Sequence, residues 1–161
     1  MSARINILIA GTGVIGGYFG SFLALNPDLN VCFLSRGAAL AHYKKHPFRI
    51  HSTVHNNIKV KINVSGKVTS FNRKFDFIFV CTKSKDTENL IPEIQKIITG
   101  NTQIVTLQNG LYNYRILKKY FGKSRCLQAA ARLVLKLIKC LSSGIRHSAF
   151  LLPAKKTVNL L

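Results

Sequence analysis

Six consecutive residues near the start of the chain have types and spacing that could bind phosphate. They form the pattern Gly-x-Gly-x-x-Gly: Gly11, Thr12, Gly13, Val14, Ile15 and Gly16. A short β-branched run precedes the pattern and a helical period follows it, so the pattern falls at a strand-to-helix junction. Free backbone amides and the helix dipole bind phosphates at such junctions. The pattern therefore predicts a site for a dinucleotide pyrophosphate, the alternative being a glycine-rich turn without a ligand.

A second feature stands where the next strand should end. An NAD site places a carboxylate there, about 20 residues beyond the glycine pattern, to bind the ribose 2′-hydroxyl. This chain has Ser35 and Arg36 instead. A guanidinium can grip a 2′-phosphate with two hydrogen bonds, and no carboxylate is present to repel it. We therefore expect NADPH in preference to NADH, unless Arg36 is merely a solvated side chain.

Strands and helices alternate along the part of the chain that must position these residues. Short apolar runs indicate buried strands, and apolar residues at a spacing of three or four indicate helices. The pattern predicts strands over 4–10, 31–34, 48–52, 58–64, 75–81 and 103–107, and helices over 14–25, 38–45 and 85–98. This alternation predicts an α/β fold of Rossmann type, with a doubly wound and mostly parallel sheet.

The end of the chain follows this pattern less well. We interpret residues 1–125 as the Rossmann NADP-binding domain and 126–161 as a degenerate or truncated basic tail, or as the last part of the same domain. Leu127–Leu141 has the composition of a helix. Such a helix could cover an open sheet edge, or it could bind a membrane surface or a partner as a basic amphipathic segment.

The charge balance is strongly basic. The chain has 24 Lys and Arg against 5 Asp and Glu, a formal net charge of +19, and residues 94–161 contain no acid. This charge would attract nucleic acid and other polyanions without specificity. The alternative is a solvated basic face, because no helix-turn-helix or aromatic-interleaved pattern accompanies the charge. No apolar run reaches the roughly 20 residues that a membrane span needs.

Cysteine and histidine patterns favour structural roles. The four cysteines are scattered, which indicates reduced, buried thiols and a cytoplasmic protein: Cys32, Cys81, Cys126 and Cys140. Cys81 could be a nucleophile beside Thr82 and Lys83, but no general base is near it in sequence. Four histidines recur at spacings of four and five without an adjoining acid or cysteine, so we expect no metal site: His42, His46, His51 and His55.

Four short motifs follow one another along the chain, each at the end of a predicted strand: Gly11–Gly17, Phe33–Gly37, Val80–Ser84 and Leu107–Gly110. With these motifs, residues 4–115 resemble the nucleotide-binding half of the ketopantoate reductases (2-dehydropantoate 2-reductases). The resemblance implies an NADPH-dependent oxidoreductase that reduces the ketone of 2-dehydropantoate in pantothenate and coenzyme A synthesis.

The resemblance also implies a role for individual residues. Gly11, Gly13 and Gly16 would bind the pyrophosphate and Arg36 the 2′-phosphate. Lys83 would line the cofactor groove, or it could be a solvated charge at a strand end. Asn109 would lie near the nicotinamide ribose and the 2-keto acid substrate, or Asn109 and Gly110 could form only a turn.

The chain departs from the family after these motifs. In the family a second, helical domain supplies the catalytic lysine and a substrate-binding carboxylate, and this chain stops at Leu161. Gly144–Ser148 is similar to the family's Pro-Gly-x-x-x-His-x-Gly motif, with Ser143 for the proline, Ala149 for the last glycine and one residue fewer between Gly144 and His147. We therefore expect a truncated cofactor half with no catalytic residue of its own, inactive unless a second chain supplies the helical domain.

Two other functions stay open. One is a non-catalytic NADP-binding remnant or sensor. The other is a basic protein that binds nucleic acid or a membrane surface on a degenerate Rossmann scaffold.

Overall fold

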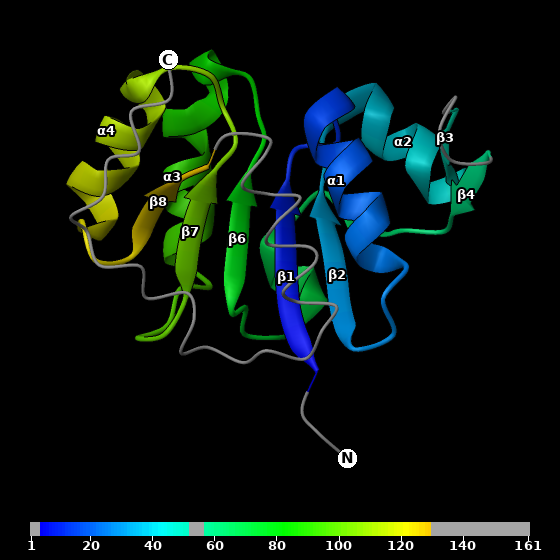
Figure 1. Cartoon of the computed structure of the whole chain (residues 1–161), viewed down its shortest axis with the longest axis horizontal. Helices are drawn as coiled ribbons and strands as arrows, with labels where there is room; N and C mark the ends of the chain where they lie inside the picture. The colour runs from blue at the N-terminus through cyan, green and yellow to red at the C-terminus, as the bar shows by residue number, and fades with distance from the viewer. Residues whose placement is uncertain (1–3, 52–56, 130–161) are drawn as a thin grey trace.

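A six-stranded parallel sheet forms the centre of the computed structural model, which describes residues 4–51 and 57–129 (Figure 1). The strand order is β5-β2-β1-β6-β7-β8, and every neighbouring pair is parallel. The order reverses between β1 and β6, as in the dinucleotide-binding fold. The predicted Rossmann-type sheet is confirmed. The strands are β1 (Ile5–Ala10), β2 (Leu29–Leu34), β5 (Asn63–Ser65), β6 (Phe77–Val80), β7 (Gln103–Thr106) and β8 (Cys126–Gln128).

Helices connect the strands and cover both faces of the sheet. α1 lies over β1 and β2 in front of the sheet, and α3 lies behind it in the view of Figure 1. A small antiparallel hairpin of β3 (Phe48–Ile50) and β4 (Ile58–Val60) stands at the outer flank beside α2. The helices are α1 (Val14–Ala24), α2 (Gly37–Lys45), α3 (Thr87–Gln95) and α4 (Leu111–Phe121), with 3₁₀ turns η1 (Val68–Phe71) and η2 (Ser84–Asp86).

β1 is apolar almost throughout because both of its faces are buried. Successive side chains point to opposite faces of a strand. Ile7 and Ile9 join one cluster, in which Phe19 and Leu23 of α1 pack against Phe33 of β2. The long apolar runs that predicted buried strands therefore reflect burial on two sides.

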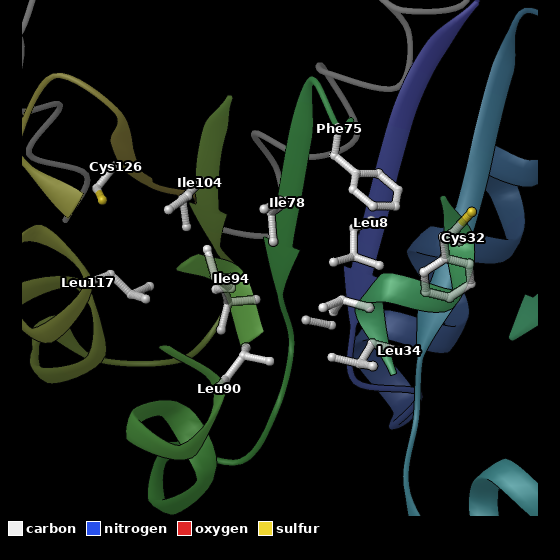
Figure 2. Packing of buried hydrophobic residues seen from close by; sticks show 14 residues of the cluster. Leu8, Cys32, Leu34, Phe75, Ile78, Leu90, Ile94, Ile104, Leu117 and Cys126 are labelled. Atoms are coloured by element: carbon white, nitrogen blue, oxygen red, sulfur yellow. The ribbon is translucent and has the colours of Figure 1, made fainter. Parts of the chain in front are cut away.

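The opposite face of the sheet carries a second cluster, shown in Figure 2. Leu8, Ile78 and Ile104 project from three neighbouring strands, and Leu90 and Ile94 of α3 pack against them. Leu117 of α4 and the thiols of Cys32 and Cys126 extend the cluster to its two sides. Burial of this kind contributes about 25 cal/mol for each Å² of apolar surface removed from water.

Two predicted elements need correction, and one helix was missed. Residues 58–64 form two strands of different sheets, with the buried Ile62 between them, because β4 pairs with β3 and β5 pairs with β2. α4 was not predicted. Leu127 and Gln128 belong to strand β8, since they pair with β7, and do not begin a helix.

The rest of the predicted helix to Leu141, and the segment Gly144–Ser148, lie outside the described residues, so the division at residue 126 stays a prediction. In 4–51 and 57–129, no helix has both the length and the apolar character that a membrane crossing requires.

Candidate nucleotide-binding site

The four motif segments meet at the carboxyl edge of the sheet. Ala10, the last residue of β1, is level with Leu34 of β2 and with Val80 of β6, and Val80 is level with Thr106 of β7. The ends of four parallel strands are therefore aligned. Ligands of open α/β sheets bind at this edge, where the strand order reverses.

Backbone hydrogen bonds hold the four loops side by side beyond the strand ends. The amide of Gly11 donates to the carbonyl oxygen of Leu34 at 3.0 Å, and the amide of Cys81 donates to Ala10 at 2.9 Å. The amide of Leu107 donates to Val80, also at 3.0 Å. The loops after β2, β1, β6 and β7 thus form one continuous row in that order.

Gly11 and Gly16 fix the shape of the glycine loop. Gly11 has φ +111°, and a Cβ there would lie 2.9 Å from the backbone of Cys81 and Thr82. A Cβ on Gly16 would lie only 2.0 Å from the carbonyl oxygen of Gly11. Any side chain at either position would push the loop from the sheet or separate α1 from β1. These contacts explain why glycine stands at both positions.

Gly13 differs from these two glycines because its surroundings are open. A Cβ built there meets no protein atom within 4 Å, and Gly13 is the N-cap of α1. Val14 and Ile15 follow it on the exposed first turn, which carries no acidic side chain. The unpaired amides of a helix N-terminus attract anions. The loop therefore fits a pyrophosphate both in space and in charge.

Arg36 lies beside the glycine loop at the end of β2. The hydroxyls of Thr12 and Ser35 are hydrogen-bonded at 2.6 Å, and both residues are buried. This contact joins the glycine loop to the residue before Arg36. Arg36 itself is exposed at the N-cap of α2. The pKa of the Glu93 carboxyl is lowered chiefly by its hydrogen bond from Lys96, and the charge of Arg36 adds to this effect, so Arg36 lies within electrostatic range of Glu93.

Lys83 and Asn109 occupy the other half of the row. Both are exposed, Lys83 after β6 and Asn109 after β7. Gly110 follows Asn109 with φ +79° and starts α4 as its N-cap. The Asn-Gly pair is therefore both a turn and a helix start, and it leaves Asn109 at the carboxyl edge.

A buried amide, which was not among the predicted site residues, ties these two loops together. Nε2 of Gln108 donates to the carbonyl oxygen of Thr82 at 2.8 Å and to the hydroxyl of Thr87 at 2.8 Å. Its Oε1 accepts from the hydroxyl of Thr106 at 3.1 Å. Gln108 thereby joins the end of β7 to the segment that carries Lys83.

The same network extends into α4. The hydroxyl of Thr87 donates to Oδ1 of Asn113 at 3.0 Å, and Nδ2 of Asn113 donates to the hydroxyl of Ser84 at 2.8 Å. Thr87, Gln108 and Asn113 are all buried. The loop after β6 is therefore held from two sides. No local sequence signal marks this role of Gln108, because its partners Thr82 and Thr87 are more than 20 residues away.

The thiol of Cys81 lies in the row but is suited to packing. Burial raises its pKa from an ordinary 9.0 to about 12. The thiol is therefore protonated near neutral pH and is a poor nucleophile. Burial also raises the pKa of Cys32 and raises that of Cys126 to about 11. These three cysteines are free thiols, and Cys140 lies outside the described residues.

The histidines do not assemble a metal site in the described part of the chain. The rings of His42 and His46 are 4.7 Å apart between centroids, and Nδ1 of His51 is 2.9 Å from Oδ1 of Asn57. No third histidine, cysteine or acid converges on either pair among residues 4–51 and 57–129. His55 lies outside these residues.

Comparison with known proteins agrees with this geometry. Residues 7–147 match a family model described as ketopantoate reductase PanE/ApbA. The chain is 31% identical over 117 residues to the 2-dehydropantoate 2-reductase of Archaeoglobus fulgidus, an alignment covering 73% of this chain and 36% of that enzyme.

Solved structures show the same similarity. The 2-dehydropantoate 2-reductase of Porphyromonas gingivalis superposes with a TM-score of 0.68 at 27% identity, over 78% of this chain and 45% of that one. A D-mandelate dehydrogenase with NADH and anilino(oxo)acetate superposes with a TM-score of 0.69 at 22% identity, over 78% and 40% of the two chains, and shows the shared fold. The chain thus spans less than half the length of these relatives.

Proposed function

The chain belongs to the ketopantoate reductase family, and on this premise we propose that it binds NADPH as the cofactor-binding part of a 2-dehydropantoate 2-reductase. The A. fulgidus and P. gingivalis relatives are both named 2-dehydropantoate 2-reductase. Because the chain spans only part of their length, we propose, and do not infer from the names of the relatives alone, that its substrate is 2-dehydropantoate and its reaction the reduction of that ketone.

The observation that carries the proposal is the row of four loops at the carboxyl edge. The space around Gly13 is open. The hydrogen bond between Thr12 and Ser35 joins the glycine loop to the segment that carries Arg36. The loops of Lys83 and Asn109 continue the row on the other side. A dinucleotide needs phosphate-binding amides at the centre of such an edge, with one group for its adenosine ribose on one side and others for its nicotinamide on the other. Here Arg36 lies on one side of the glycine loop, and Lys83 and Asn109 lie on the other.

Each part of the row has a distinct task in the proposed complex. The amides at Gly13 and the first turn of α1 hold the pyrophosphate, and Arg36 binds the 2′-phosphate. A bound NADPH would supply the hydride for the carbonyl of a 2-keto acid. Lys83 and Asn109 orient the nicotinamide end and the substrate. We assign the proton donor to none of these residues, so the chain alone is expected to bind without rapid turnover.

Arg36 underlies the preference for NADPH over NADH. The D-mandelate dehydrogenase with the similar fold was solved with NADH, so the fold alone does not decide between the nucleotides. The side chain after β2 makes the difference, because a carboxylate there favours the 2′-hydroxyl and a guanidinium favours the 2′-phosphate. This chain has the guanidinium.

Calorimetric titrations of the purified chain with NADPH and with NADH test the proposal. We expect NADPH to bind at least tenfold more tightly, equivalent to about 1.4 kcal/mol. A parallel assay follows NADPH oxidation with 2-dehydropantoate. Binding without oxidation would assign the catalytic step to groups outside this site. A folded chain that binds neither nucleotide would refute the proposed function.

A further inference from the structure

Exposed cations gather on the outer flank of the molecule, apart from the carboxyl-edge loops. The end of α2 contributes Lys44 and Lys45, and the hairpin contributes Arg49 and Lys59. Lys61 follows the hairpin, and all five side chains are exposed. Figure 1 shows α2 and the hairpin together at this side, beyond α1 and β2. We name these five residues the flank cluster.

The hairpin presents its charges to solvent because its other face is packed. Ile50 and Val60 are buried, and the ring of Phe48 fills the space beside Gly17 of α1. The alternate residues Arg49 and Lys59 face outward, directly opposite each other in the antiparallel pair. Like charges opposite each other destabilise a strand pair. An anion bound across them would remove this cost.

Three members of the flank cluster line a hollow. It has a volume of about 760 Å³, and its lining includes Lys44, Lys45, His46 and Lys61. Tyr43 forms part of its wall and stacks on Phe48, with ring centroids 5.1 Å apart. The hollow is therefore a concave surface with lysines in its lining and an aromatic ring in its wall.

Acidic side chains do not balance this charge locally in the sequence. Between Asp28 and Asp76 the chain has nine Lys and Arg and no Asp or Glu. Within the described ranges 4–51 and 57–129, the one ion pair joins Lys96 to Glu93, on α3 and its C-cap. The cations of the flank cluster are thus available to an external anion.

The surroundings favour a nucleic acid over a membrane. Membrane-surface segments combine cations with exposed apolar side chains that enter the lipid. The exposed large apolar side chains of the described residues all lie outside 37–64: Val14, Ile15, Leu25, Leu111, Tyr112, Tyr120 and Leu127. A concave surface rimmed by exposed lysines instead suits a chain of phosphodiesters, which it contacts without reading bases.

We propose that the flank cluster binds the phosphodiester backbone of a nucleic acid, independently of base sequence. The site uses none of the residues assigned to NADPH. Its affinity follows from cation–phosphate contacts and the release of counterions, so it falls steeply with salt. The interaction gives the chain a second ligand on a surface separate from the carboxyl edge.

The test measures the binding of a fluorescein-labelled, single-stranded RNA of about 20 nucleotides by fluorescence anisotropy. The NaCl concentration is varied from about 50 to about 200 mM, a range over which phosphate contacts weaken strongly. The flank variant carries Lys44→Gln, Lys45→Gln, Arg49→Gln and Lys61→Gln. A matched variant removes four exposed cations around α4: Arg115→Gln, Lys118→Gln, Lys119→Gln and Lys123→Gln. Both lose the same net charge, so a general attraction affects them equally.

We expect the flank variant to lose roughly tenfold or more in affinity and about three units of salt slope, and the matched variant to change about twofold or less. Circular dichroism and NADPH titration confirm that both variants are folded. Equal losses in the two variants, or no RNA binding by the parent chain, would overturn the proposal. So would flank-dependent binding to phosphatidylserine vesicles without flank-dependent binding to RNA. NADPH affinity is measured separately. A negative RNA result therefore refutes only the nucleic-acid site, and a negative NADPH result refutes only the proposed function.

Discussion

The side-chain amide of Gln108 donates a 2.8 Å hydrogen bond to the carbonyl oxygen of Thr82, across the gap between two loops of the carboxyl edge. The next residue along the chain is Lys83 in one loop and Asn109 in the other. This partly buried bond therefore fixes the spacing of the two loops that carry the exposed side chains proposed to orient the nicotinamide end. The loops that carry these exposed side chains are thus held together by the buried side chain of Gln108.

Gln108→Met should loosen both loops. The carbonyl oxygen of Thr82 and the hydroxyl of Thr87 would lose their donor, and an unsatisfied buried group costs about 1–3 kcal/mol. We expect a lower free energy of unfolding in urea and a several-fold higher Kd for NADPH. Gln103→Met, at the amino end of β7, is the matched control and should leave the Kd unchanged. An unchanged stability and Kd in Gln108→Met would remove the positioning role.

Gly13→Ala and Gly16→Ala should separate binding from folding. At Gly13 an added methyl meets no protein atom and φ is −68°, so the fold should keep its thermal midpoint while the pyrophosphate loses its close approach. At Gly16 the methyl would lie 2.0 Å from a carbonyl oxygen, so the fold itself should lose stability, by about 1–3 kcal/mol as for other overpacked sites. Thermal unfolding and NADPH titration measure both effects.

A Gly13→Ala chain that bound NADPH as tightly as the parent would contradict the proposed pyrophosphate position. A Gly16→Ala chain with unchanged stability would show that α1 can move from β1 at little cost.

Arg36→Gln should abolish the preference between the nucleotides. A lost charge-assisted contact with the 2′-phosphate weakens NADPH binding by about 1.5–3 kcal/mol, which is roughly 10- to 150-fold. NADH has no such phosphate, so its Kd should change by less than about twofold. Arg4→Gln, before the amino end of β1, serves as the control for net charge. Parallel losses for both nucleotides would assign Arg36 a structural role.

The Cys81 thiol should make stability depend on pH in the alkaline range. Its folded pKa is raised to about 12, whereas the unfolded thiol ionises near 9.0. The unfolded state alone releases the proton between these values, so stability present below pH 9 is lost as the pH rises towards 12. The slope is roughly 1 kcal/mol per pH unit from this thiol.

Urea unfolding of the parent chain and of Cys81→Ala at pH 8 and pH 10.5 measures this slope. The alanine variant should lose less stability between the two pH values. Because the other titrating groups are common to both chains, their contributions cancel in the difference. Peptide mapping should also find Cys81 slow to react with iodoacetamide at pH 8 in the folded chain. Rapid labelling there would contradict a buried, protonated thiol.

The sequence predicts most of the central sheet because its signals are local. Ile7 and Ile9 stand in an uninterrupted apolar run, which only a strand buried on both faces requires. The glycine pattern marks its own junction for a similar reason, since the contacts of Gly11 and Gly16 leave no room for side chains.

Features that depend on the choice of a distant partner are not visible in the sequence. Residues 58–64 alternate in the same way whether they pair with β3 or with β2, so their division between two sheets depends on tertiary contacts. Strand β8 is three residues long, too short for a recognisable period. Gln108 looked like an unremarkable neighbour of Asn109, because its partners Thr82 and Thr87 are more than 20 residues away.

The most direct test of the proposed NADPH site is an amide chemical-shift titration of ¹⁵N-labelled chain with NADPH. We predict that the shifts concentrate in the four loops of the carboxyl edge, at Gly11–Gly17, Arg36–Gly37, Lys83 and Asn109–Gly110. The same titration of Gly13→Ala should abolish them while leaving the spectrum of a folded protein. Shifts confined to the flank cluster, or no shifts at saturating NADPH, would contradict the central claim.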